Sequence, residues 1–156
     1  MPSLINYRDL NISSDPEVAQ VAEIHETAPG YWIPGYCPEP KQIGQRIEQL
    51  KKLDGCTDRF FQLAETSDGK IVGFHWLDLE ETPDETFGHI KSLWVHDDYQ
   101  HQGIAYELKR NGEIWAKNKG VTHIKTTVHA NNAKMLKFNL RFGFKQGFIE
   151  MEKRLT

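Results

Sequence analysis

The sequence predicts a single mixed α/β domain over residues 1–156, and three observations favour that class. Stretches with strand-like and helix-like periodicity are interspersed along the whole chain. An Asp-Gly turn joins two apolar runs near the middle, which is typical of a β-hairpin. A strand–helix–strand order follows, as in a crossover connection within one sheet. A chain of 156 residues is long enough to bury one core without disulfide support.

The first third of the chain predicts a strand and two helices. Leu4–Arg8 reads as a short strand, and Ser14-Asp15-Pro16-Glu17 as a helix start, because Ser and Glu three residues apart form a capping box. A second helix is expected over 43–50, where apolar residues recur at helical spacing. Between the helices, residues 29–40 contain four prolines and several aromatic residues, which predicts a loop.

The remaining elements follow in order. Arg59–Glu65 and Ile71–Leu77 predict the two strands of the hairpin, with Asp68-Gly69 in its turn. We then expect, in this order, a strand over Gly88–Val95, a helix from Ile104 to about Gly120, a strand over Ile124–His129, a helix over Ala133–Phe142 and a strand over Phe144–Leu155.

Composition excludes several classes of function. The net charge is -3 and the basic residues are dispersed among acidic ones, which disfavours a nucleic-acid-binding domain. No run of eighteen apolar residues occurs, and the first residues lack the basic and apolar regions of a signal peptide, so none is expected there. Cys37 and Cys56 are isolated in the sequence, so a reducing, cytoplasmic location is expected, although one long-range disulfide is an alternative. The seven histidines have no metal-ligand spacing, so no metal site is expected.

The turn Gln100-His101-Gln102-Gly103-Ile104-Ala105 is the most informative stretch. It joins an apolar strand to a helix, and a helix N-terminus offers unpaired N–H groups to an anion. Gly103 lets a ligand approach the main chain closely. The turn is neither a dinucleotide fingerprint nor a Walker A loop, and it lacks the lysine that a reacting phosphate requires. It therefore predicts an anchor for an unreactive pyrophosphate; the alternative is that Gly103 only permits the turn.

Two linked motifs resemble those of the GCN5-related N-acetyltransferase (GNAT) superfamily. Leu93-Trp94-Val95 followed by Tyr99-Gln100-x-x-Gly103-x-Ala105 is similar to its acetyl-CoA-binding motif, and Asn132 to Phe144 is similar to its second motif. The resemblance implies the acyl-CoA N-acyltransferase fold, a mixed and mostly antiparallel sheet of about six or seven strands with about four helices. It also implies acetyl-CoA as co-substrate, with no metal.

The resemblance assigns the cofactor-binding residues. The turn would hold the pyrophosphate on its amides, and the strand before it would pair with the pantetheine arm through its main chain. Asn132 would contact the cofactor, alongside or instead of acting as a simple N-cap. The full expected set is Leu93, Trp94, Val95, Gln100, His101, Gln102, Gly103, Ile104, Ala105, Tyr106, Asn132 and Asn139.

The candidate catalytic residues are His89 and Asn139. Family members commonly carry Glu at the position of His89, and an imidazole suits base catalysis near neutral pH; the alternative is an ordinary strand histidine. Asn139 stands where the family usually has a Tyr that assists the leaving sulfur. An amide donates a hydrogen bond but is no general acid, so Asn139 would assist weakly, or Tyr106 or a water would substitute.

These residues predict an acetyl-CoA-dependent N-acetyltransferase whose acceptor is the amine of a small molecule or peptide. Trp32 and Tyr36 of the aromatic loop are expected to line the acceptor pocket, whereas Trp76 is expected in the core. The alternative function is a catalytically silent acyl-CoA-binding or sensor module of the same fold. A homodimer is compatible with either, and no nucleic-acid or membrane partner is expected.

Overall fold

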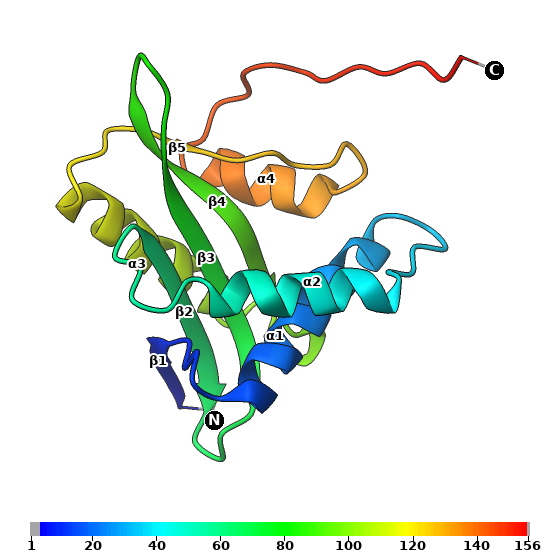
Figure 1. Ribbon diagram of the computed structural model, residues 1–156. Helices are drawn as coiled ribbons and strands as arrows, with labels where there is room; N and C mark the ends of the chain where they lie inside the picture. Colours follow the sequence, from blue (N-terminus) through cyan, green and yellow to red (C-terminus); the bar gives the residue numbers. More distant parts are fainter. Residues whose placement is uncertain (1–3, 156) are drawn as a thin grey trace.

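The computed structural model describes residues 4–155 and contains one mixed sheet flanked by helices (Figure 1). The strands occur in the order β1-β2-β3-β4-β5, which is also their order in the chain. Strands β1 to β4 pair antiparallel with one another, and β5 pairs parallel with β4. The elements are β1 (Ile5–Asp9), α1 (Asp15–Thr27), η1 (Ala28–Tyr31), α2 (Pro40–Lys51), β2 (Arg59–Thr66), β3 (Ile71–Glu81), β4 (Thr86–Val95), η2 (Asp97–Tyr99), α3 (Ile104–Asn118), β5 (Ile124–Lys125) and α4 (Ala133–Arg141).

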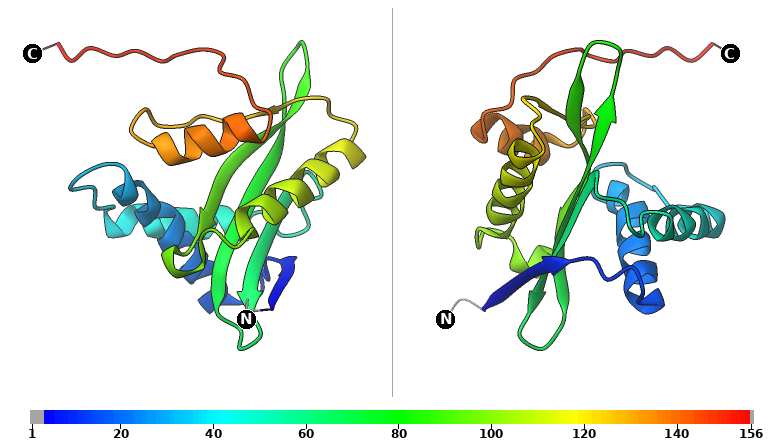
Figure 2. Two further views of the ribbon diagram at one scale, coloured as in Figure 1. Left: turned by 180° about the vertical axis from the view of Figure 1, so that it is seen from behind. Right: turned by 60° about the vertical axis from the view of Figure 1, so that its left-hand side comes forward.

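Helices cover both faces of the sheet (Figure 2). Helices α1 and α2 lie on one side, and α3 and α4 lie on the other. This arrangement explains the sequence of β3, whose first seven residues are all buried. A strand covered on both faces needs apolar side chains at successive positions instead of the alternating pattern of a half-exposed strand.

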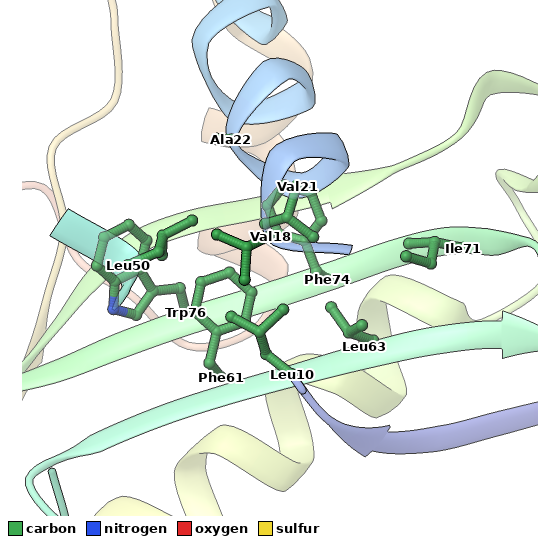
Figure 3. Close-up of a cluster of buried hydrophobic side chains, with 10 residues drawn as sticks. All are labelled: Leu10, Val18, Val21, Ala22, Leu50, Phe61, Leu63, Ile71, Phe74 and Trp76. Carbon is green, nitrogen blue, oxygen red and sulfur yellow. The ribbon is translucent and has the colours of Figure 1, made fainter. Parts of the chain in front are cut away.

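The larger core lies between the sheet and α1 and α2 (Figure 3). The Phe61 ring packs at a tilt against the rings of Phe74 and Trp76 in this layer, with centroids 5.7 and 5.3 Å away. Trp76 is 1% exposed, which agrees with its predicted place in the core. A smaller cluster on the other face packs the start of α3 against the strands.

Two sequence-based details of the helix starts need adjustment. Ser14 caps α1 as expected, since its Oγ accepts from the Glu17 N–H at 3.4 Å. The Glu17 carboxylate does not complete the box; it accepts from the Asn11 N–H and pairs with Arg8. A full capping box instead opens α2, between Glu39 and Gln42.

The C-terminal part of the predicted sheet is shorter than expected. The strand expected over Ile124–His129 pairs with β4 only at Ile124 and Lys125. The strand expected over Phe144–Leu155 is absent: residues 144–155 form no strand, and the segment runs away from the helices in Figure 1. The two residues of β5 are too few to provide an edge with which this segment could pair. The described sheet therefore has five strands instead of about six or seven.

Candidate active site

The candidate site lies where β4 and β5 separate. The two strands pair only at Gly88 and His89 of β4. A bulge follows, because Trp76 and Leu77 of β3 face Ser92 and Ile90, leaving Lys91 without an opposite residue. No backbone hydrogen bond in residues 4–155 joins the 90–94 stretch of β4 to residues 126–129. A cavity of about 350 Å³ opens between these two segments.

The turn after β4 has the backbone form of an anion-binding loop. His101 and Gly103 both have left-handed φ angles, 62° and 83°. Gly103 caps α3 without a side-chain hydrogen bond, so the first N–H groups of the helix are left for a ligand or water. No atom lies within 4 Å of the position that a Gly103 Cβ would occupy, so the loop is open on that side. These features fit a pyrophosphate held by main-chain amides.

Gln100 ties this turn to the end of β4 and to α4. Its Nε2 donates to the Val95 carbonyl and to Asp97 Oδ1, both at 3.2 Å. Its Oε1 accepts a hydrogen bond from the Lys134 ammonium on α4. The turn itself lacks a lysine, but the fold brings this one to it from 34 residues away in the sequence.

Helix α4 contributes two asparagines to the cavity. Asn132 caps the helix by accepting from the Met135 N–H at 3.2 Å, and it also lines the cavity. Both readings of Asn132, cap and cavity residue, are thus compatible with its position. Asn139 lies deeper, at 4% exposure, and its Oδ1 accepts a hydrogen bond from the ammonium of Lys109 on α3.

Lys109 is a buried cation in the wall of this cavity. It is 2% exposed, and the ring of Phe144 lies 4.3 Å from its Nζ. Burial lowers the pKa of Lys109 to about 8 from its ordinary value of 10.5. The ammonium still predominates at neutral pH, so the cavity contains a desolvated positive charge that was not among the residues predicted from the sequence.

His75 lies beneath the bulge of β4. It is 1% exposed, and its Nδ1 donates to the Ser92 carbonyl at 2.9 Å. Burial lowers the pKa of His75 to about 3, with the nearby charge of Lys109 as a smaller cause. His75 is therefore neutral at physiological pH and holds the main chain of β4 in place beside the cavity.

Helices α1 and α2 and the segment after α1 form the far wall. Trp32, one of the two predicted acceptor residues, lines the cavity there, and Tyr31 does so as well. His25 is half-buried against the Trp76 ring, and this burial lowers its pKa to about 4, with Arg46 as a further cause. Arg46 pairs with Glu26 at 2.6 Å, so this wall offers a donor and an acceptor side by side.

Ten of the predicted site residues lie outside the cavity lining. Seven of them, Val95 and the turn from Gln100 to Ala105, continue β4 beyond the cavity, and the other three are His89, Tyr36 and Tyr106. The imidazole of His89 is held at the base of β4, where Nδ1 lies 2.6 Å from Glu80 Oε1 and 3.1 Å from Lys91 Nζ. Lys91, two residues further along, does line the cavity. Tyr36 and Tyr106 do not line it, and Tyr106 instead packs edge-on against the Phe142 ring.

The structure brings most of the remaining predicted residues together. Leu93, Trp94, Asn132, Asn139 and Trp32 border one cavity, and the turn from Gln100 to Ala105 follows directly from the strand that forms its wall. The residues that sequence reasoning missed are Lys109, Lys134, Lys91, His25 and Arg46. A signal existed for the first of these, because Lys109 falls on the inward-facing side of α3, beside Leu108.

Residues 4–155 contain neither a metal-binding cluster nor a membrane-spanning helix. No group of three or more His, Cys, Asp or Glu side chains there is arranged to hold a metal ion. None of the helices in this part of the chain combines the length and the apolar character needed to cross a membrane.

Comparison with known proteins agrees with the geometry. The sequence model of the acetyltransferase (GNAT) family matches residues 20–144. A mycothiol acetyltransferase from Thermobifida fusca (strain YX) is 24% identical over 146 residues, which is 83% of this chain and 45% of that protein. The chain thus spans less than half the length of this curated relative.

Solved structures share the fold. A proposed acetyl transferase from Pyrococcus furiosus superimposes with a TM-score of 0.74 at 22% identity, covering 97% of this chain and all of that one (100%). An aminoglycoside antibiotic 6'-N-acetyltransferase from Acinetobacter baumannii has a TM-score of 0.70 at 16% identity, covering 98% of this chain and 100% of that one. At these sequence identities the structural similarity establishes the fold alone. The match of the family's sequence model to residues 20–144 establishes family membership. This chain belongs to the acetyltransferase (GNAT) family.

Proposed function

We propose that the protein is an acetyl-CoA-dependent N-acetyltransferase that moves the acetyl group directly to the amine of a small molecule or peptide. The observation that carries this proposal is the unpaired edge of β4, which leads straight into the open turn at Gly103. A strand edge and a row of helix N–H groups in continuation match the two parts of the co-substrate, the amide-bearing arm and the pyrophosphate.

The residues present fit acetyl-CoA, which would supply the acyl group as an activated thioester. The main chain of Leu93 to Val95 would pair with the arm, and the turn amides and the Lys134 ammonium would hold the pyrophosphate. A strand N–H beside the cavity would stabilise the oxyanion that forms at the acetyl carbonyl. The acceptor would enter along the wall that contains Trp32 and the Arg46–Glu26 pair.

His89 remains our proposed base. An alkyl amine is almost wholly protonated at neutral pH and must lose a proton before it attacks. Glu80 would hold the Nδ1–H of His89 at 2.6 Å, which leaves Nε2 free to take that proton. Because the ring does not line the cavity, a water would relay the proton past Lys91.

The binding step is tested first, by isothermal titration of the purified protein with acetyl-CoA. We expect wild type to bind, and Gly103→Val to raise the Kd by about tenfold or more, because Val resists a φ of 83° and displaces the turn amides. Gly69→Val is the matched control: Gly69 has a φ of 85° and equally open surroundings, but lies in the β2–β3 turn. Equal loss of affinity in both variants would contradict the assigned role of the turn.

Turnover is tested next, with a thiol-release assay and a panel of amines. The panel includes peptides, polyamines and the aminoglycosides for which one structural neighbour is named. Release of thiol that depends on an acceptor supports the transferase. Tight binding of acetyl-CoA without turnover on any amine would instead favour the silent acyl-CoA-binding module.

Three further expectations belong to this proposal. The chain would act as a single acetyltransferase domain over residues 1–156. Cys37 and Cys56, both free and exposed, would be kept reduced in a cytoplasmic setting. Size-exclusion chromatography would decide between monomer and homodimer.

A further inference from the structure

The buried lysine of α3 has no role in the mechanism described so far. Lys109 is 2% exposed, and a buried ammonium is costly unless it is paired. Its hydrogen-bond partner is an amide oxygen, that of Asn139, instead of a carboxylate. Three aromatic rings, those of Phe138, Phe142 and Phe144, surround the charge at 5.4, 5.7 and 4.3 Å. The arrangement holds a cation in place without neutralising it.

The ammonium determines how the Asn139 amide is turned. A lysine ammonium only donates hydrogen bonds, and the amide NH2 group is also a donor. The ammonium therefore pairs with Oδ1 and not with the NH2 group. The Nδ2 group of Asn139 then faces away from Lys109. In residues 4–155 every fully buried side-chain nitrogen or oxygen has a hydrogen-bond partner. The Nδ2 of Asn139 has no partner among these residues, so this atom is not fully buried. Because Asn139 lines the cavity, its NH2 group is available there as a donor.

We propose that Lys109 is a positioning residue for acetyl transfer: it orients the Asn139 amide toward the leaving sulfur and places a positive charge behind it. This inference rests on the proposed transferase function. Together the two side chains would stabilise the leaving sulfur, as a tyrosine hydroxyl would at this position. The amide would supply the hydrogen bond and the ammonium the positive charge. Asn139 would touch the sulfur, and Lys109 would act through it.

The chemistry balances without another reactant. The amine nitrogen forms a bond to the acetyl carbon, and the carbon–sulfur bond breaks with its electron pair remaining on sulfur. The proton of the amine goes to the base. The sulfur leaves as a thiolate, whose ordinary pKa near 8.5 makes stabilisation by a hydrogen bond and a charge sufficient without an acid.

The test measures the thiol pKa of CoA bound to the protein, which requires neither an acceptor nor turnover. Thiolate formation is followed by its ultraviolet absorbance from about pH 6 to about pH 10, with the desulfo-CoA complex as the blank. In wild type we expect the bound thiol to ionise about one pKa unit below free CoA, a tenfold larger thiolate-to-thiol ratio at a given pH. Lys109→Met, which keeps the apolar stem, should remove at least half of that shift.

Two further variants distinguish the proposed role from a folding defect and from a general effect of removing a positive charge. Asn139→Asp places a carboxylate beside Lys109, where the ion pair favours folding and cancels the charge; the bound thiol should then ionise above free CoA. Lys117→Met removes the same charge from an exposed position near the end of α3 and should match wild type. The other titratable groups around Lys109 are unchanged in every variant: Glu113 of α3, His75 of β3, Lys91 of β4, and His25, Glu26, Arg46 and His129 across the cavity.

The outcomes separate the two proposals. If wild type binds CoA and its thiol pKa is the same in Lys109→Met, the inference is overturned while the proposed function stands. If Lys109→Met does not fold or does not bind CoA, the Asn139→Asp variant decides. A bound-thiol pKa in Asn139→Asp that equals the wild-type value overturns the inference. Failure of wild type to bind CoA by titration calorimetry overturns the proposed function, and this inference with it.

Discussion

Acid should destabilise the protein through His75, the histidine buried beneath the β4 bulge. Burial lowers its pKa to about 3 in the folded protein, whereas the unfolded chain binds the proton with a pKa near 6.5. Below about pH 6.5 the unfolded state therefore binds more protons than the folded state. The stability that His75 allows is complete above that pH and is lost progressively as the pH falls toward 3.

The size of the effect follows from the two pKa values. At about pH 5 the unfolded chain gains about 2 kcal/mol from protonating this residue, and the folded state gains almost nothing. His25, whose pKa is lowered to about 4, adds a loss of similar size at the same pH. Together they remove about 4 kcal/mol, a large part of the stability of an ordinary domain.

Urea denaturation at about pH 8 and about pH 5 measures this loss. In His75→Gln the amide can still donate to the Ser92 carbonyl but cannot take up a proton, so the variant should lose about 2 kcal/mol less than wild type between the two pH values. His123→Gln, a change at an exposed histidine, serves as the control. If His75→Gln and wild type lose equal stability, His75 is not held neutral by burial and the reasoning is wrong.

Three other changes have defined outcomes. Gly112→Ala should cost about 1–3 kcal/mol in urea denaturation, because its Cβ would lie 3.0 Å from side chains of β3, whereas Gly44→Ala in open surroundings on α2 should stabilise by about 0.5–1 kcal/mol; equal effects would refute the close packing. Lys134→Met should weaken acetyl-CoA binding several-fold and flatten its salt dependence, unlike the exposed Lys137→Met on the same helix; identical titrations for both would exclude the lysine from the site. His89→Gln should lower turnover and change the shape of the pH–rate profile, and an unchanged profile would mean that another group takes the proton.

Local features of the site could be read from the sequence because short-range rules control them. The turn at Gly103 needs a residue that tolerates positive φ, followed by the start of a helix. The six consecutive residues Gln100 to Ala105 contain both. The Asn132 cap and the Asp68-Gly69 hairpin turn are equally local. Each depends on hydrogen bonds between residues at most four apart, so no knowledge of the distant chain was needed.

Strand pairing at the C-terminal side was beyond such rules. A strand was expected over Phe144–Leu155, but a strand exists only where an edge is available to pair with it. The bulge at Lys91 and the short β5 remove that edge, and neither is visible in the local sequence. The same separation of β4 and β5 creates the cavity on which the proposed function depends.

What the sequence by itself determined is the family, the class of fold and the position of the Gly103 turn, to which we assign the cofactor. Only the tertiary structure decided which charges meet in the cavity: Lys109 with Asn139, 30 residues apart, and Lys134 with Gln100, 34 residues apart. It also set the imidazole of His89 beside Glu80 and away from the cavity lining. Periodicity specifies which face of a helix turns inward, but the electrostatics of a buried group depends on every segment that packs around it, and that packing is settled only when the whole chain has folded.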